Sequence, residues 1–552
     1  MNPITVYQAR KIITMNPMQP QATHVAVRDG RILAVGDLGR MRAWGAFDLD
    51  TRYAGQVLMP GLVEGHCHLM AGGLWQFPFV GFHARTAPDG KVWAGCRNFD
   101  EVVARLIDLE AQLGDPAKPL LVWGFDPIFF GSERMTVRHL DRVSTSRPIV
   151  ILHASQHLMN VNSAALEQAG ITRDTEVEGV ARFESGEPTG ELQEFAAMFP
   201  IARLTGNIFR VAGTTEQSLR LFGQIAQLAG VTTATDLVND LSDDNARVLQ
   251  KVTAEADFPV RLVPAYIGLD GSVSRDAGAA RVTSRVATNT DKLHFGLVKI
   301  VTDGSIQGYT ARVRWPGYYN GHENGIWIQP PAELKATIAH FHAAGFQLHI
   351  HTNGDEATEL ALDGIEAALA AHPRADHRHT LQHCQMADAA QFRRMARLGI
   401  CANLFANHIY YWGDAHHALT MGPDRAERMD ACGTALAHGV PLAIHSDAPI
   451  TPLGPMFTAW CAVNRLTSSG RVLGASERIG VADALRAITL GAAYTLRLDD
   501  RVGSIEVGKY ADFCVLDEDP LAAQPEALKD LRIAGTVLGG RALALPGAAV
   551  GR

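Results

Sequence analysis

The stretch Val57-Leu-Met-Pro-Gly-Leu-Val-Glu-Gly-His-Cys-His-Leu-Met70 decides how this sequence is interpreted. It is an apolar run that ends in His66 and His68, with Cys67 between them. Side chains two residues apart on a strand project from the same face, so both imidazoles would point one way and the cysteine the other. Imidazole is a common metal ligand and a common surface group, so the motif alone allows two metal ligands at a strand end or two unrelated polar residues.

The composition is that of a globular protein. The chain has 552 residues, 47% of them hydrophobic and 20% charged, with a formal net charge of −8 and seven scattered cysteines. We therefore expect a small-molecule substrate, reduced thiols, and neither nucleic acid nor membrane as a partner. The first residues lack a secretory signal pattern and no apolar run approaches ~18 residues, which predicts a cytoplasmic protein. If the chain oligomerises, a homodimer is expected.

Between residues 59 and 497, apolar strand-like runs alternate with helical stretches. Continuous Val/Ile/Leu-rich runs are typical of a parallel sheet that is covered on both faces. Eight runs, each followed by enough chain for a helix, predict an α/β fold of the closed (β/α)8 TIM barrel type. The expected strands are residues 57–68, 230–237, 260–267, 293–302, 346–351, 380–383, 400–405 and 441–445.

An insertion is expected after the first barrel strand. The interval of about 71–229 is too long for one crossover and must hold elements of its own. Leu120 to Phe125 and Pro148 to His153 are the expected strands. Asn162 is expected to cap a helix that ends at Gly170.

Both chain ends consist of short strand-like runs separated by turns. Asp29-Gly30 is a strong two-residue hairpin signal. Because neither end can bury both faces of a sheet alone, we expect residues 1–58 and 498–552 to join into one composite β-sandwich. Its expected strands are residues 4–7, 11–14, 24–28, 31–35, 53–58, 511–516, 531–538 and 542–545.

Polar residues stand at the ends of several barrel strands. Lys299 lies in the fourth, apolar strand, where an unpaired ammonium would be costly. It is either paired with Asp303 or another carboxylate, or carbamylated by carbon dioxide so that it becomes an anionic metal bridge. His349 and His351 share a face of the fifth strand, and His351, nearer the C-terminal end, is better placed for the barrel mouth. His383 and Asp447 end the sixth and eighth strands, and the whole set converges on one mouth.

At this point the sequence resembles the amidohydrolase superfamily of metal-dependent hydrolases, and within it the amidohydrolase-3 branch that includes N-substituted formamide deformylase. The similarity extends over nearly the whole chain. It rests on the segments 60–68, 162–166, 186–190 (Gly-Glu-Pro-Thr-Gly), 299–304, 351–355, 378–383, 446–449 and 503–512.

The resemblance implies a role for each polar residue of the mouth. His66 and His68 would bind one metal, Lys299 would bridge as a carbamate, and His351 and His383 would bind a second metal. Asp447 would transfer the proton and can also act as a ligand of the first metal. The chain departs from many relatives at two positions, with Gln382 in place of glutamate and His445 in place of glycine.

The implied chemistry is hydrolysis of a C–N bond in an amide, N-acyl or N-formyl compound by a metal-activated hydroxide. A bound divalent metal lowers the pKa of its water toward ~7, and a pair of metals ~3.5 to 4 Å apart can hold a bridging hydroxide. Zn²⁺, one or two ions per subunit, is the first expectation, with Mn²⁺, Fe²⁺ or Co²⁺ as alternatives. Asp355 either orients an imidazole or caps the next helix. A deaminase, a lactone or ester hydrolase, and a catalytically silent binding scaffold remain alternative functions.

Substrate specificity is expected in the loop after the seventh strand, residues 407–417, which is dense in aromatic residues and histidines. On this basis His408, Tyr411, Trp412 and His445 are predicted to contact the substrate. The alternative is that the aromatic residues pack against a neighbouring helix or the insertion. The sequence also leaves open whether the insertion acts as a lid.

Overall fold

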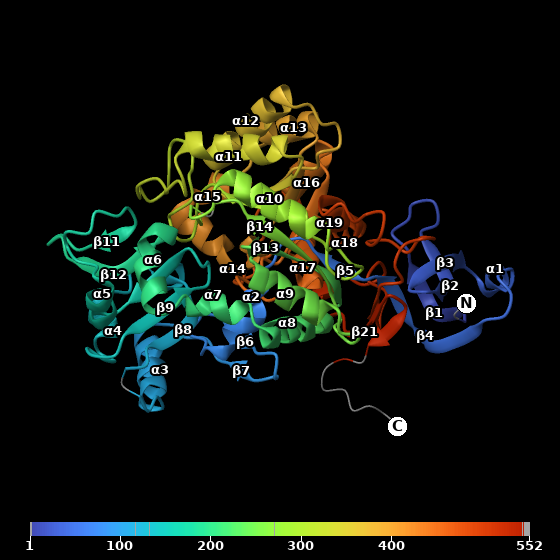
Figure 1. Ribbon diagram of the computed structural model, residues 1–552, viewed down its shortest axis with the longest axis horizontal. Coiled ribbons are helices and arrows are strands. Elements are labelled where there is room, and N and C mark those ends of the chain that lie inside the picture. The colour runs from blue at the N-terminus through green and yellow to red at the C-terminus, as the bar shows by residue number, and fades with distance from the viewer. Residues whose placement is uncertain (1–2, 116, 132, 270, 544, 546–552) are drawn as a thin grey trace.

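The computed structural model describes residues 3–115, 117–131, 133–269, 271–543 and 545. A sheet that includes β5, β13 and β14 lies at the centre of the molecule (Figure 1). It has eight strands, every strand runs parallel to its neighbours, and the spatial order follows the chain order. Its strands are β5 (Leu62–Glu64), β13 (Val231–Asn239), β14 (Arg261–Ile267), β15 (Leu297–Val301), β16 (Gln347–Thr352), β17 (Thr380–His383), β18 (Cys401–Leu404) and β19 (Leu442–Ile444).

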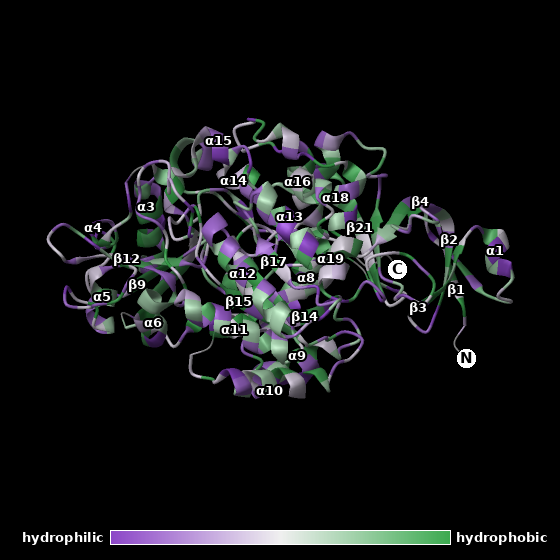
Figure 2. Ribbon diagram, turned by 90° about the horizontal axis from the view of Figure 1, so that it is seen from above, coloured by the Kyte–Doolittle hydropathy of each residue, from purple (hydrophilic) through white to green (hydrophobic). Residues whose placement is uncertain are grey.

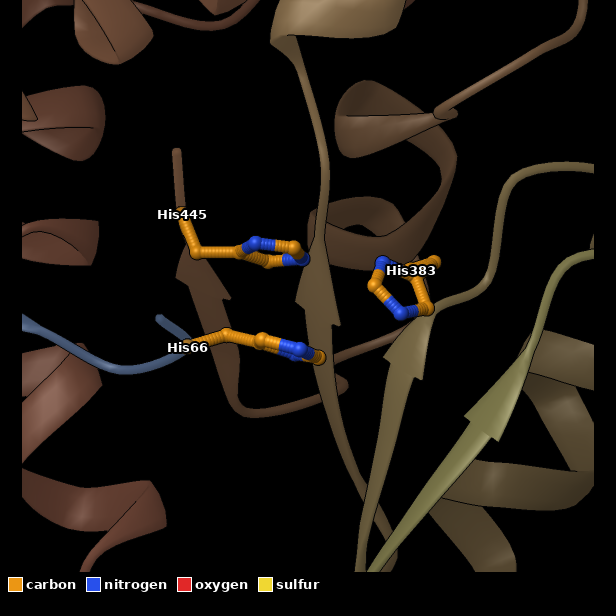
Figure 3. A group of neighbouring side chains, drawn as sticks. All are labelled: His66, His383 and His445. Atoms are coloured by element: carbon orange, nitrogen blue, oxygen red, sulfur yellow. The ribbon is translucent and has the colours of Figure 1, made fainter. Parts of the chain in front are cut away.

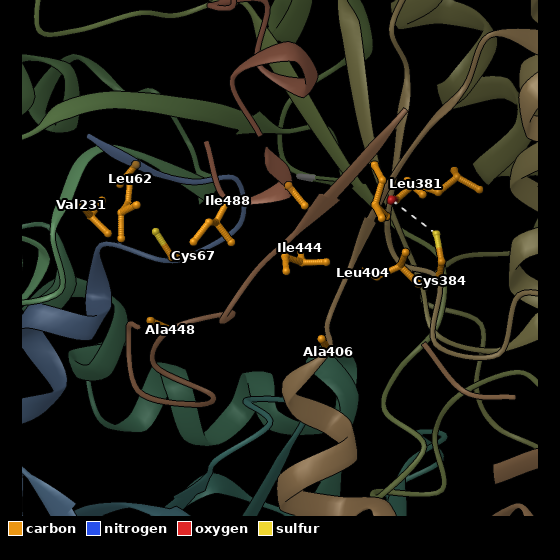
Figure 4. Close-up of a cluster of buried hydrophobic side chains, with 14 of the residues drawn as sticks. Leu62, Cys67, Val231, Leu381, Cys384, Leu404, Ala406, Ile444, Ala448 and Ile488 are labelled. Atoms are coloured by element: carbon orange, nitrogen blue, oxygen red, sulfur yellow. Dashed lines mark hydrogen bonds between the residues drawn. The ribbon is translucent and has the colours of Figure 1, made fainter. Parts of the chain in front are cut away.

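Helices cover the outside of this sheet, as the alternating pattern predicts. They are α8 (Glu216–Leu228), α9 (Asp243–Thr253), α10 (Arg275–Val286), α11 (Pro331–Ala343), α12 (Asp355–Ala371), α13 (Ala389–Leu398), α16 (Cys432–Ala437) and α18 (Val481–Ala487). The buried residues between sheet and helices form one large apolar cluster, part of which is drawn in Figure 4. The prediction of a TIM-like (β/α) barrel is confirmed.

The first and last strands meet just beyond their ends. Cys67 pairs with Ala448 in an isolated parallel bridge, and the N–H of His68 donates to the carbonyl of Ala448 at 2.8 Å. The carboxylate of Glu64 accepts hydrogen bonds from both the N–H and the hydroxyl of Ser446, each at 3.0 Å. These contacts bring the polar residues that follow β5 and β19 to one place.

The expected first barrel strand, residues 57–68, is wrong as a single element. Its first part belongs to β4 (Asp48–Pro60), which pairs with strands of a different sheet, and only β5 enters the barrel. The break lies at Gly61, whose N–H donates to the carbonyl of Asp512 at 2.9 Å. The two histidines therefore follow the strand instead of ending it.

Strands from both chain ends form one seven-stranded sheet of order β22-β21-β20-β4-β1-β2-β3. Besides β4 it contains β1 (Thr5–Ile13), β2 (Gln21–Arg28), β3 (Arg31–Gly36), β20 (Phe513–Leu516), β21 (Ile533–Leu538) and β22 (Arg541–Leu543). The runs 4–7 and 11–14 are thus one strand with an irregular register. Of the expected strand 542–545, Ala544 lies outside the described residues. That this sheet is part of a two-layer sandwich stays a prediction.

The segment between β5 and β13 carries a separate five-stranded sheet of order β11-β12-β10-β9-β8. Its strands are β8 (Leu120–Phe125), β9 (Ile149–His153), β10 (Leu158–Val161), β11 (Val180–Arg182) and β12 (Pro188–Gln193). Helix α5 (Ser163–Ala169) begins after its cap Asn162 and ends at Gly170, as predicted. Seen from above, this part and the seven-stranded sheet flank the barrel on opposite sides (Figure 2).

All seven cysteines are buried and unpaired, as expected for reduced thiols. Within the described ranges, the helices are too short or too polar to cross a lipid bilayer.

Candidate metal centre

His66, His68 and Asp447 converge where the first and last strands meet. The Nε2 atoms of His66 and His68 lie 3.3 and 3.2 Å from Oδ1 of Asp447, although neither contact has hydrogen-bond geometry. Cys67 points away, with its Sγ donating to the carbonyl of Thr235 at 3.0 Å. The opposite directions expected from the His-x-His spacing are therefore found, even though the motif lies beyond the strand.

Lys299 is buried in β15, and its Nζ has no hydrogen-bond partner among the described residues. Burial lowers the pKa of this amine from 10.5 to about 7, so much of it is neutral near pH 7. The alternative of an ion pair with Asp303 is wrong. That carboxylate instead accepts backbone N–H groups of Arg312, Asn353 and Gly354 at 2.9 to 3.1 Å.

His351 and His383 face each other from adjacent strands, with ring centroids 4.5 Å apart. The ring of His383 also lies 4.6 Å from that of His66, and its Nδ1 lies 3.7 Å from Oδ2 of Asp447. Burial lowers the pKa of His66, His351 and His383 well below 6.5, which favours the neutral imidazole that binds metal ions. His383 and Asp447 have φ angles of +68° and +51°. Non-glycine residues in this disfavoured region are concentrated at functional sites.

The side chain of Gln382 forms hydrogen bonds with two histidines, His66 and His349. Its Oε1 accepts a hydrogen bond from Nδ1 of His66 at 2.7 Å and another from Nδ2 of Asn403 at 2.9 Å. Its Nε2 donates to Nδ1 of His349, also at 2.7 Å. His349 is thereby used in the interior, whereas His351 lies at the cavity. Holding Nδ1 of His66 fixes the ring so that Nε2 faces Asp447.

His445 is buried and does not border the cavity. It is fully buried, its ring stacks on that of His66 at 4.5 Å, and it stacks on Phe405 at 4.9 Å. Figure 3 shows the rings of His445 and His66 side by side, both extending toward His383. The three histidines each place one ring nitrogen within 4.8 Å of the others. Among the described residues no group hydrogen-bonds either nitrogen of His445.

All six predicted ligand positions line one cavity of about 150 Å³. They are His66, His68, Lys299, His351, His383 and Asp447.

Of the four predicted substrate contacts, His408 lines this cavity. Tyr411, Trp412 and His445 do not border it. The indole N–H of Trp412 donates to Asp126 of the insertion at 2.7 Å, and the ring of Tyr411 packs against His83 at 5.3 Å. Their placement corresponds to the packing alternative, because these aromatic residues join the loop to the insertion.

Glu64 and His157 had no role in the sequence-based prediction, and Asp355 differs from both alternatives given for it. Glu64 holds the loop before Asp447 through Ser446, and burial raises its pKa to about 8. Asp355 neither caps its helix, whose cap is Gly354, nor contacts an imidazole in the described structure, and it accepts the N–H of Arg314 instead. His157 of the insertion also lines the cavity. Only the position of Glu64 within the His-x-His segment could have signalled its role.

A divalent cation fits this set of donors. The buried atoms Nζ of Lys299, Nδ1 of His383 and Oδ1 of Asp447 have no hydrogen-bond partner in the described part of the chain. Each unpaired buried polar atom costs roughly 1–3 kcal/mol, and a shared cation would offset that cost. Imidazole and carboxylate together are the donors typical of zinc and similar metals.

Comparisons with known proteins identify a family and a shared fold. The sequence profile of the Amidohydrolase family matches residues 54–544. The chain is 28% identical to the protein LONG AFTER FAR-RED 3 of Arabidopsis thaliana, over 96% of this chain and 90% of the relative. It is 26% identical to N-substituted formamide deformylase of Arthrobacter pascens, over 96% of each chain. An uncharacterized metal-dependent hydrolase from Pyrococcus horikoshii has the same fold, with a TM-score of 0.68, 19% identity, and coverage of 95% of this chain and 99% of the other.

Proposed function

The chain belongs to the amidohydrolase family, and from this premise we propose that it is a metal-dependent hydrolase that cleaves a C–N bond in an amide, N-acyl or N-formyl compound. The observation that carries the proposal is the single cavity lined by all six candidate ligands. A binding scaffold without catalysis would have no need to bury the amine of Lys299, which has no hydrogen-bond partner among the described residues, in the cavity that Asp447 also lines.

The metal would be held in two groups. His66, His68 and Asp447 form the first, and His351 and His383 the second, with Lys299 between the groups as a carbamate. We propose zinc, one or two ions per subunit, with manganese, iron or cobalt as alternatives. When bound, the metal would lower the pKa of water and polarise the carbonyl group of the substrate.

Asp447 is the proposed proton carrier. Hydrolysis adds a hydroxyl group to the carbonyl carbon, breaks the C–N bond and adds a proton to the departing nitrogen. Asp447 would accept the proton that water loses and donate it to that nitrogen, acting first as base and then as acid. Its carboxylate is buried and lies beside His66 and His68.

The cavity is suited to a small substrate. Its volume of about 150 Å³ holds an amide group and a few more atoms. The cavity is not fully enclosed, and its lining includes His408 and the insertion residue Phe195, which a larger group of the substrate would meet. Relatives support the proposed bond, since N-substituted formamide deformylase bears that activity in its name.

A substrate panel on zinc-loaded protein tests this proposal. N-formyl, N-acetyl and N-benzoyl amines, an aminopurine and a lactone would be compared, with separate assays for amine, ammonia and acid. We expect release of amine plus carboxylate from at least one amide. Release of ammonia alone, or ring opening of the lactone alone, would instead identify a deaminase or a lactone hydrolase.

A further inference from the structure

The insertion contributes a histidine–glutamate pair to the cavity. Nδ1 of His157 and Oε2 of Glu194 are 2.8 Å apart, and both side chains are largely buried. The backbone supports the same pairing, because the N–H of Glu194 donates to the carbonyl of His157 at 2.7 Å. The two residues lie at adjacent ends of the antiparallel strands β10 and β12, where Leu158 pairs with Gln193.

His157 uses one ring nitrogen for this pair and keeps the other for the cavity. It lines the same cavity as Lys299 and His351, and its ring centroid lies 5.4 Å from that of His351. With Nδ1 directed at Glu194, Nε2 is the nitrogen available to a ligand. A carboxylate that fixes one imidazole nitrogen is a common way to orient the other toward a substrate.

The backbone next to His157 and at Glu194 has an unusual conformation. Gln156 and Glu194 are non-glycine residues with φ angles of +62°, a disfavoured conformation that is concentrated at ligand-binding sites. A Cβ on Gly304, three residues beyond β15, would lie 2.2 Å from Oε1 of Glu194 and 2.0 Å from Oγ1 of Thr310. The glycine therefore allows the carboxylate of Glu194 to lie close to the loop that follows β15.

The Gly-Glu-Pro-Thr-Gly segment at 186–190 helps to position Glu194. It forms the turn between β11 and β12 and the start of β12, the strand that ends immediately before Glu194. Gly190 has φ +92°, and a Cβ there would lie 2.3 Å from the carbonyl oxygen of Val161 on β10. The segment therefore sets how closely β12 and β10 approach, and so where Glu194 meets His157.

We propose that the insertion forms part of the substrate site: His157 hydrogen-bonds the amide group of the substrate through Nε2, and Glu194 is the positioning residue that holds its ring. This inference rests on the proposed hydrolysis of an amide and adds a substrate contact that lies outside the barrel. The insertion would then contact the amide group of the substrate directly, in addition to covering the barrel mouth.

The test compares H157A, E194A, the double variant and E194Q with wild type, using N-formylbenzylamine as the probe. We expect kcat/KM to fall about 10- to 100-fold in H157A and in E194A, the loss of one hydrogen bond to a buried polar group. The double variant should lose no more than H157A alone, because both changes remove the same contact. E194Q keeps an oxygen that accepts from Nδ1 and should recover part of the loss. Metal content should match wild type, and each variant should still be folded at the assay temperature, although the single variants leave one buried partner unpaired and should unfold at a lower temperature.

His139 and Glu133 provide a matched control, since they form a second pair in the same insertion, with Nε2 and Oε1 3.2 Å apart, and do not line the cavity. H139A and E133A should retain wild-type kcat/KM. The inference is overturned if H157A keeps kcat/KM within twofold of an active wild type, or if the losses in the double variant multiply. Turnover by the wild type tests the proposed hydrolysis itself, so a failure there is distinct from a failure of the His157–Glu194 contact.

Discussion

Replacing Lys299 with methionine should stabilise the metal-free protein while destroying its function. The side chain is 2% exposed, and its amine has no hydrogen-bond partner in the described structure. Methionine has a similar length and no charge to bury. The difference between the ordinary pKa of 10.5 and the folded value of about 7, at ~1.36 kcal/mol for each pH unit, sets the gain at ~5 kcal/mol at most.

The stability difference between K299M and wild type should depend on pH. Because burial lowers the pKa of Lys299, the unfolded chain binds the proton more tightly than the folded one between pH 7 and 10.5. The free energy of unfolding of the wild type should therefore rise with pH across that window. The advantage of K299M should be largest at or below about pH 7 and should vanish near pH 10.5.

Urea titrations of both metal-free proteins, in buffer depleted of carbon dioxide, would measure this difference at pH 6.5 and pH 9.5. K335M is the control, because Lys335 is exposed and forms a surface ion pair with Asp363; its effect should stay within ~0.5 kcal/mol. If K299M is less stable than wild type at pH 6.5, or if its advantage does not change with pH, the amine is not buried in the way described.

Three further predictions concern the surroundings of the site. Q382L removes the hydrogen bond to Nδ1 of His66 and should weaken metal binding ~10- to 100-fold, measured by competition with a chromogenic chelator; unchanged affinity would show that the ring needs no such partner. D447N should lower kcat by ~10² to 10⁴, and metal analysis of the same sample separates proton transfer from ligand loss; near-normal kcat with full metal would move that role to another group. D126N cannot ionise, and it keeps one acceptor oxygen where Asp126 uses two, for the N–H groups of Trp412 and Ile128. Because burial raises the pKa of Asp126 to about 6, its stabilising contribution is lost as pH rises through that value, so the stability of D126N relative to wild type should rise by up to ~3 kcal/mol between pH 3.5 and pH 7.5. The same stability difference at both pH values would contradict this assignment.

Much of the barrel could be predicted from sequence because its strands are buried on both faces and read as continuous apolar runs. The strand at 380–383 has the predicted bounds, and the others differ mainly at their ends. The first strand shows the limit of this reasoning. A single apolar run from Val57 crosses from one sheet to another at Gly61, and hydrophobicity reports burial but not which partner strand provides it.

The candidate ligands could be found because each stands near a strand end, where the fold gathers side chains at one mouth. Contacts between distant segments could not be found in this way. Trp412 packs on Asp126, 286 residues away, and His157 meets Glu194 across 37 residues of the insertion. No local spacing encodes such pairs, since they depend on how segments far apart in the chain are brought together.

We propose that this cavity binds metal and uses it for amide hydrolysis. To test this, metal is removed with a chelator, zinc is added back in measured equivalents with bicarbonate present, and amine release from N-formylbenzylamine is followed beside H66A and H351A. We expect no activity without metal, a linear recovery that saturates at one or two equivalents, and neither recovery nor stoichiometric binding in the two variants. Full turnover by the metal-free protein, or normal recovery in both variants, would contradict it.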